Sequence, residues 1–320
     1  MNTSIILIIF TIFSVFIAFS IGANDETFST VHGSRTLKMK EILVLTTILA
    51  VLGAFLLGRS VSETVGKELL NVEVNDALAL TILISTAIWL IISSILGVPI
   101  STTHSTIGSI IGVGLLISGI QGVNWIKILE MGFWWVLSPV IGYIVSYIVY
   151  KLIHKTVISK LNGFKDFERT ERNFSYILVA IICLTAFSRA GNDCSNAVGI
   201  VVGIGIDLNF ILIIAGISFS LGIIVLGRTV IKSVGDITEL VPSSAFASQV
   251  PTAIILFVGT FLGIPLSGSH MLVASLLGLA KARRAPVKKG LWKTVLIWVL
   301  TFPMAAILAI FLFAPIDFFI

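Results

Sequence analysis

The tetrapeptide Gly22-Ala23-Asn24-Asp25 returns, with two positions exchanged, as Ala190-Gly191-Asn192-Asp193. Each copy ends an apolar stretch long enough to cross a bilayer, so both carboxylates are expected at membrane depth. A carboxylate there costs about 2.5–3.5 kcal/mol on the insertion scale. Carrying this cost twice, at matching places, indicates two related binding elements and predicts a transporter with an internal duplication.

The composition is that of a membrane protein. Of the 320 residues, 57% are hydrophobic and 12% are charged, whereas soluble domains carry about 25% charged residues. The net charge of +5 is concentrated in two loops, and the positive-inside rule accounts for it. The chain is therefore expected to be an all-α polytopic membrane protein that contacts the lipid bilayer and no nucleic acid.

The apolar spans fall into two sets of five. They lie at 4–21, 42–58, 77–96, 105–120, 131–150, 173–189, 208–227, 245–262, 268–280 and 294–314. The spans at 105–120 and 268–280 are short, and each follows a Gly-x-Pro sequence. Interrupted spans at corresponding positions are a sequence sign of a transporter's binding site.

Three motifs recur in the same order at nearly constant offsets of 168, 169 and 166 residues. They predict one repeat over residues 1–150, a basic linker over 151–172 and a second repeat over 173–320. The linker and the loop at 281–293 each hold six Lys or Arg residues and are expected to be cytoplasmic. Five spans in each half predict an inverted repeat with discontinuous helices, and both termini outside the cell membrane.

The two Asn-Asp pairs predict cation sites. An ionised Asp beside an Asn amide oxygen, at a helix break that frees backbone carbonyls, suits Na⁺, and the carboxylate could equally take up a proton. Asp25 and Asp193 are the expected Na⁺ ligands, with Asn24 and Asn192 beside them. The break also exposes N–H groups that favour an anion. The alternative is that each Asp only caps the next half-helix.

The two hairpins, Pro-x-Ser-Thr-Thr-His and Pro-x-Ser-Gly-Ser-His, predict an anion site. Small hydroxyl residues follow a proline where a helix begins, and unpaired N–H groups at two facing helix starts could hold a tetrahedral oxyanion without a fixed cation. The alternative is ordinary Ser/Thr capping after a proline. The hairpin residues are Ser101, Thr102, Thr103, Ser267, Gly268 and Ser269.

Three further residues are candidates for supporting roles. His104 and His270 end the hairpins and could bind the anion, shuttle protons or brace the hairpin; bracing is favoured. Arg189 precedes the second motif and has no counterpart in the first copy. Arg189 is expected to pair with an acid in the core, and Glu26 is the candidate.

These motifs resemble the inorganic phosphate transporter (PiT) family, which includes sulfate permeases. The likeness runs from about residue 20 to residue 280 and rests on Gly-Ala-Asn-Asp-x-x-Asn and the Pro-x-Ser-Thr-Thr-His hairpin. The second copy contains the later Asn as Asn196, whereas Phe28 stands there in the first copy. Glu26 beside Asp25 also departs from the pattern and leaves the coupling ion open.

The resemblance implies cation-coupled phosphate uptake. The implied anion contacts are Asn24, Ser101, Thr102, Thr103, Asn192, Ser267, Gly268 and Ser269. The implied cation contacts are Asn24, Asp25, Glu26, Asn192, Asp193 and Asn196. A homodimer is expected from the resemblance alone.

Four classes of function remain open on the sequence. The favoured one is a Na⁺–phosphate symporter that works by alternating access, with phosphate and Na⁺ as its ligands, no other cofactor and no enzymatic activity. A proton-coupled phosphate or sulfate permease is the nearest alternative, because both anions are tetrahedral. A passive anion channel and an intramembrane aspartyl protease are more remote, and the protease is disfavoured because Asn precedes each Asp.

Overall fold

The fold is all-helical over the residues that the structure, a computed structural model, describes: 3–95, 100–204, 206–287 and 291–319. An isolated bridge between Leu70 and Val123 is the one β-type pairing in those ranges. The helices are α1 (Thr3–Ala23), α2 (Ser29–Gly33), α3 (Met39–Glu63), α4 (Asp76–Ile95), α5 (Thr102–Ser118), α6 (Trp125–Thr156), α7 (Phe164–Val198), α8 (Leu208–Gly222), α9 (Arg228–Gly235), α10 (Pro242–Phe261), α11 (Gly268–Arg283) and α12 (Leu291–Phe319).

Each of the ten predicted apolar spans coincides with a helix. Eight helical segments within the described ranges are long and apolar enough to cross a membrane, and α4 and α11 are not among them. Of the two predicted Gly-x-Pro breaks, the one at 97–99 lies outside the described residues. The other begins at Gly263, whose φ of +73° is costly for other residues.

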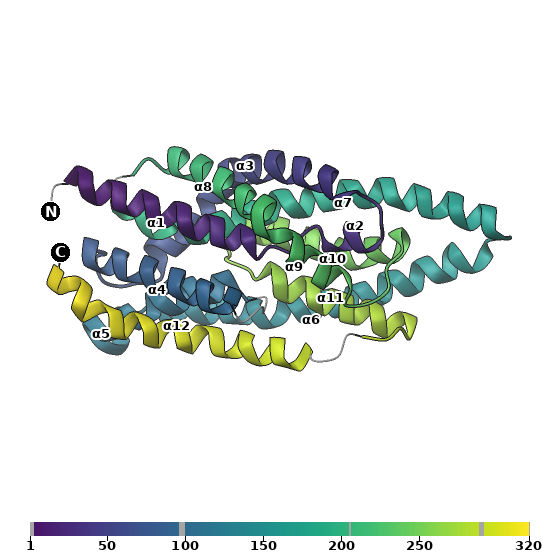
Figure 1. Cartoon of the computed structure of the whole chain (residues 1–320). Helices are drawn as coiled ribbons and strands as arrows, with labels where there is room; N and C mark the ends of the chain where they lie inside the picture. The colour runs from purple at the N-terminus through teal and green to yellow at the C-terminus, as the bar shows by residue number, and fades with distance from the viewer. Residues whose placement is uncertain (1–2, 96–99, 205, 288–290, 320) are drawn as a thin grey trace.

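The helices α6 and α7 are longer than a membrane requires. They contain 32 and 35 residues, about 48 and 52 Å at 1.5 Å per residue, whereas the hydrocarbon core is about 30 Å thick. Figure 1 shows their connection projecting from one end of the bundle, while both chain termini lie at the other end. The basic linker is therefore mostly helical.

Contacts between helices recur in corresponding pairs in the two halves of the chain. The contact of α3 with α7 has a counterpart in that of α8 with α1, and the contact of α11 with α6 in that of α5 with α12. Two glycines show the same correspondence. A Cβ at Gly53 would lie 2.0 Å from the carbonyl oxygen of Phe187, and one at Gly222 would lie 2.0 Å from that of Phe19. Both pairs of helices thus touch backbone to backbone, which only glycine allows.

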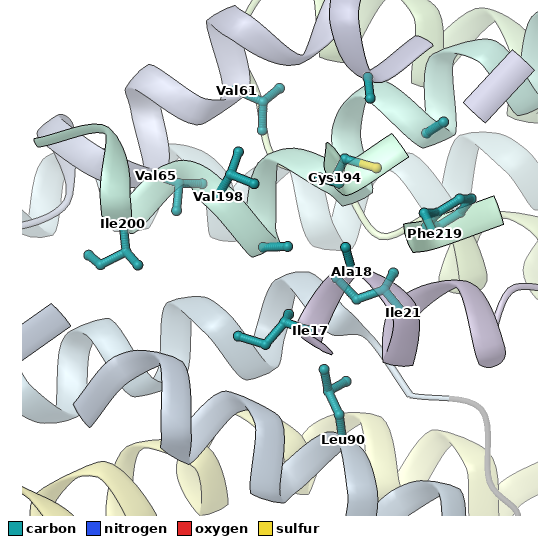
Figure 2. Packing of buried hydrophobic residues seen from close by; sticks show 14 of the residues in the cluster. Ile17, Ala18, Ile21, Val61, Val65, Leu90, Cys194, Val198, Ile200 and Phe219 are labelled. Carbon is teal, nitrogen blue, oxygen red and sulfur yellow. The ribbon is translucent and has the colours of Figure 1, made fainter. Parts of the chain in front are cut away.

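An apolar core surrounds the first motif and the second. Figure 2 shows Ile17 and Ile21 of α1 near Cys194 of α7 and Phe219 of α8, with Leu90 of α4 below. All are at most 2% exposed. The outer faces are also apolar, since the exposed side chains include many Ile, Leu, Val and Phe residues, as a lipid-facing surface requires. Polar groups inside this core must therefore find their partners within the protein.

Candidate functional site

The first motif lies at a helix break, as predicted. The helix α1 ends at Ala23, and α2 begins at Ser29. Asp25 holds the turn between them, because its Oδ1 accepts from the backbone N–H of Thr27 (2.8 Å) and from the Thr27 hydroxyl (2.6 Å). The start of α2 has no side-chain cap, so Asp25 is not simply the cap of the next helix.

The second motif does not lie at a break, and the prediction of one there is wrong. The helix α7 continues through it to Val198. Nothing in this stretch removes a backbone donor, and its polar side chains bond to the preceding turn. Ser195 Oγ donates to the carbonyl of Gly191 (2.6 Å), and Asn196 Nδ2 donates to that of Asn192 (3.3 Å). The carbonyls expected to be free are thus engaged inside the helix.

Both hairpins begin with a serine that caps the following helix. The alternative of ordinary Ser/Thr capping after a proline is therefore correct for two of the six hairpin residues, Ser101 and Ser267. Ser101 Oγ accepts from the backbone N–H of His104 at the start of α5 (3.2 Å), and Ser267 Oγ accepts from that of His270 at the start of α11 (3.4 Å). Each hydroxyl hydrogen can still be donated elsewhere. Thr102 follows at the helix start and is half-buried.

The hairpins contact each other through Thr103, whose Oγ1 donates to the carbonyl of Leu266 (3.0 Å) and accepts from Asn196 Nδ2 (3.1 Å). Asn192 braces the second hairpin. Its Oδ1 accepts from the N–H of Leu266 (3.2 Å), and its Nδ2 donates to the carbonyl of Ile264 (3.1 Å). The structure therefore brings the two hairpins and the second motif together, with Asn192 engaged as a positioning residue.

Arg189 lies at the centre of the two motifs. Its Nη1 is 2.7 Å from Glu26 Oε1, and its Nε is 3.1 Å from Asp193 Oδ2 and 3.5 Å from Asp25 Oδ1. The predicted Arg189–Glu26 ion pair is confirmed. Nη2 also donates to Ser269 Oγ (3.1 Å), so the prediction of an anion hairpin without a fixed cation nearby is wrong. All three carboxylates are buried.

Two buried oxygen atoms at this site have no hydrogen-bond donor: Glu26 Oε2 and Asn196 Oδ1. Leaving a buried acceptor unpaired costs about 1–3 kcal/mol, and more if it is charged. Both are hard-oxygen acceptors of the kind that alkali cations bind. Among the described residues, no group of three His, Cys, Asp or Glu side chains is arranged as a metal-ligand set; the guanidinium of Arg189 lies between the carboxylates instead.

The two histidines stack in an aromatic row. The rings of His104 and His270 are 4.8 Å apart. His104 packs on Trp135 (4.3 Å) and His270 on Trp298 (4.1 Å). Trp135 Nε1 also donates to the carbonyl of Pro265 (2.9 Å). The row connects α5 and α11 to α6 and α12, and a bracing role for the two histidines stays a prediction.

Sequence reasoning missed a buried polar chain next to the first motif. Gln249 Nε2 donates to Thr30 Oγ1 (2.8 Å), and Gln249 Oε1 accepts from Thr185 Oγ1 (3.3 Å). All three residues are almost inaccessible to solvent. The sequence feature that could have indicated this chain is Gln249, a single side-chain amide within the apolar span 245–262.

The chain matches known proteins over most of its length. The sequence model of the phosphate transporter family matches residues 21–309. The chain is similar to a Pyrococcus furiosus protein named as a phosphate permease, at 27% identity over 95% of this chain and 94% of that protein. It is also similar to inorganic phosphate transporter 2-1, chloroplastic, of Arabidopsis thaliana, at 26% identity over 93% of this chain and 70% of that protein.

A solved structure described as the sodium-dependent phosphate transporter superposes with a TM-score of 0.91, at 28% identity, and covers 98% of this chain and 100% of that one. These relatives are transporters and not enzymes, so the protease alternative is wrong. With its multiple membrane-spanning helices and a family match over most of its length, this chain belongs to the phosphate transporter family.

Proposed function

We propose that the chain is a secondary active symporter that imports inorganic phosphate together with Na⁺ by alternating access. One observation carries the proposal: three buried carboxylates surround Arg189, which also donates to Ser269 at the start of the second hairpin helix. Carboxylates attract cations, and helix starts attract anions. The Arg189–Ser269 hydrogen bond (3.1 Å) places the two kinds of site next to each other, as coupled transport requires.

The charges provide the coupling. Asp25, Glu26 and Asp193 carry three negative charges when ionised, and Arg189 supplies one positive charge. The remaining negative charge repels a phosphate anion at short range in a medium of low dielectric constant. Bound Na⁺ removes this repulsion, so the anion binds after the cations. Asn196 Oδ1, which lacks a donor, and the half-buried Asn24 are the further cation ligands in this proposal, whereas Glu26 is paired with Arg189.

The hairpins supply the anion contacts. The hydroxyl hydrogens of Ser101 and Ser267 remain available beside the first N–H groups of α5 and α11. Thr102 and Ser269 add hydroxyl groups, and Gly268 lets the second hairpin approach Arg189.

Alternating access follows from two inverted repeats, at 1–150 and 173–320, with the linker 151–172 between them. The paired helix contacts and the twin Gly–Phe approaches support this division. The projecting end of α6 and α7 carries the basic linker and is assigned to the cytoplasm of a cell-membrane protein. Both termini lie at the opposite end (Figure 1) and are assigned to the outside.

Uptake of radiolabelled phosphate into proteoliposomes tests this function. We expect uptake to follow an inward Na⁺ gradient, to be absent with K⁺ and an imposed pH gradient, and to persist in excess sulfate. Asp25→Asn and Asp193→Asn should each abolish it, whereas Asp166→Asn on the exposed linker should not. Uptake that follows only the pH gradient would identify a proton-coupled permease, and abolition by sulfate a sulfate permease. Uptake that does not saturate would identify a channel.

A further inference from the structure

Three residues at the site depart from the correspondence between the two halves of the sequence. Aligned on the Asn-Asp pairs, Arg189 stands opposite Ile21, and Glu26 stands opposite Cys194. Aligned on the hairpins, Gly268 stands opposite Thr102. Each Asn-Asp motif thus has one charged residue where the other copy has an uncharged one. The second hairpin has a glycine where the first has a threonine.

These three residues meet in space. Arg189 Nη1 and Glu26 Oε1 form the shortest ion pair of the cluster, at 2.7 Å. A Cβ at Gly268 would lie 2.9 Å from Arg189 Nε and 3.0 Å from Cζ. The guanidinium therefore fills the space that a side chain like that of Thr102 would need. The three departures form one structural unit.

Within this unit Glu26 makes the shortest ion pair with the guanidinium of Arg189. Asp193 and Asp25 share the single Nε on the other edge, at 3.1 and 3.5 Å. Both aspartates thus keep oxygen lone pairs for other ligands, while the Arg189–Glu26 pair is neutral. Arg189 is also one turn from Asp193 on the same continuous helix, so it stays with the site when the protein changes conformation.

We infer that Arg189 acts as a fixed cation. It permanently neutralises one of the three carboxylates, and two mobile cations neutralise the other two. The inference rests on the proposed function and specifies its stoichiometry. A fixed positive charge also stabilises the empty carrier, because leaving a buried charge uncompensated is strongly destabilising. The empty site then returns across the membrane with two uncompensated charges rather than three.

Dual-isotope flux in proteoliposomes tests the inference, with the ratio of Na⁺ to phosphate as the readout. Glu26→Gln releases the guanidinium toward the two aspartates, so the ratio should fall from two to one. Arg189→Gln alone should raise it to three or abolish uptake. The double variant Glu26→Gln/Arg189→Gln restores the charge balance and should return the ratio to two. Folding of each variant is checked by gel filtration and thermal melting in detergent.

Several results would overturn the inference. One is an unchanged ratio in Glu26→Gln, and another is a folded double variant that has a different ratio or no uptake. A double variant with a preserved ratio but a phosphate KM raised more than tenfold would assign Arg189 to the anion instead. Failure of the wild type to couple phosphate uptake to Na⁺ is a separate outcome, since it contradicts the proposed function before any variant is compared.

Discussion

Gly268→Ala should destabilise the protein through Arg189. The new Cβ would lie 3.0 Å from Arg189 Cζ, and ordinary carbon contacts begin near about 3.5 Å, so the guanidinium must recede by roughly half an ångström. That movement is enough to carry its 3.1 Å bonds to Asp193 and Ser269 to the limit of hydrogen-bonding range. Losing one charge-assisted bond costs about 1.5–3 kcal/mol.

The assay is the thermal unfolding midpoint in detergent. We expect Gly268→Ala to lower it by several degrees, whereas Gly132→Ala, in a helix where a Cβ meets nothing within 4 Å, should leave it unchanged or raise it. The decisive comparison repeats Gly268→Ala in a Glu26→Gln/Arg189→Ala background, where no guanidinium remains to be displaced. The same loss of stability in both backgrounds would refute the reasoning.

Three further predictions concern other contacts. Glu171→Ala removes two bonds to Ser243 at the start of α10 (2.8 and 2.6 Å) and should lower the free energy of unfolding by about 1–3 kcal/mol, measured as a lower melting midpoint; an unaltered midpoint would contradict this capping role. Thr103→Val keeps the side-chain shape but loses both bonds between the hairpin and its neighbours, so phosphate uptake should fall at least tenfold while Thr103→Ser retains it; equal uptake by the two would exclude the role. Gly22→Ala would place a Cβ 1.9 Å from a backbone oxygen of α8 and should prevent accumulation of folded protein, measured by gel filtration against Gly132→Ala; a folded product would mean that the two helices can separate.

Local patterns predicted much of this molecule. Long apolar runs locate the helices because burial of backbone groups in lipid leaves little choice but a helix. The Arg189–Glu26 pair followed from the cost of two lone charges in apolar sequence. Serine after a Pro-x step predicted the starts of α5 and α11, although their capping role was the disfavoured alternative.

Other features depended on tertiary contacts that no local pattern contains. The helix α7 runs unbroken through the second motif, which contacts the second hairpin through Asn192, whereas α1 ends at the first motif. Similar motifs thus adopt different backbones. The use of Asn192 as a brace and the chain through Gln249 require knowing which helices are neighbours, and neighbours far apart in sequence are set by packing.

The unequal backbones of the two motifs have a mechanical consequence. The second motif is part of a continuous helix, whose internal hydrogen bonds resist bending, so its side chains move only as α7 moves as a whole. The first lies in a short loop between α1 and α2, where rotation about a few backbone dihedrals displaces Asp25 without disturbing either helix. Entry and exit of ions would then be governed by deformation on one side of the site alone, so the two directions of transport need not share one rate-limiting motion.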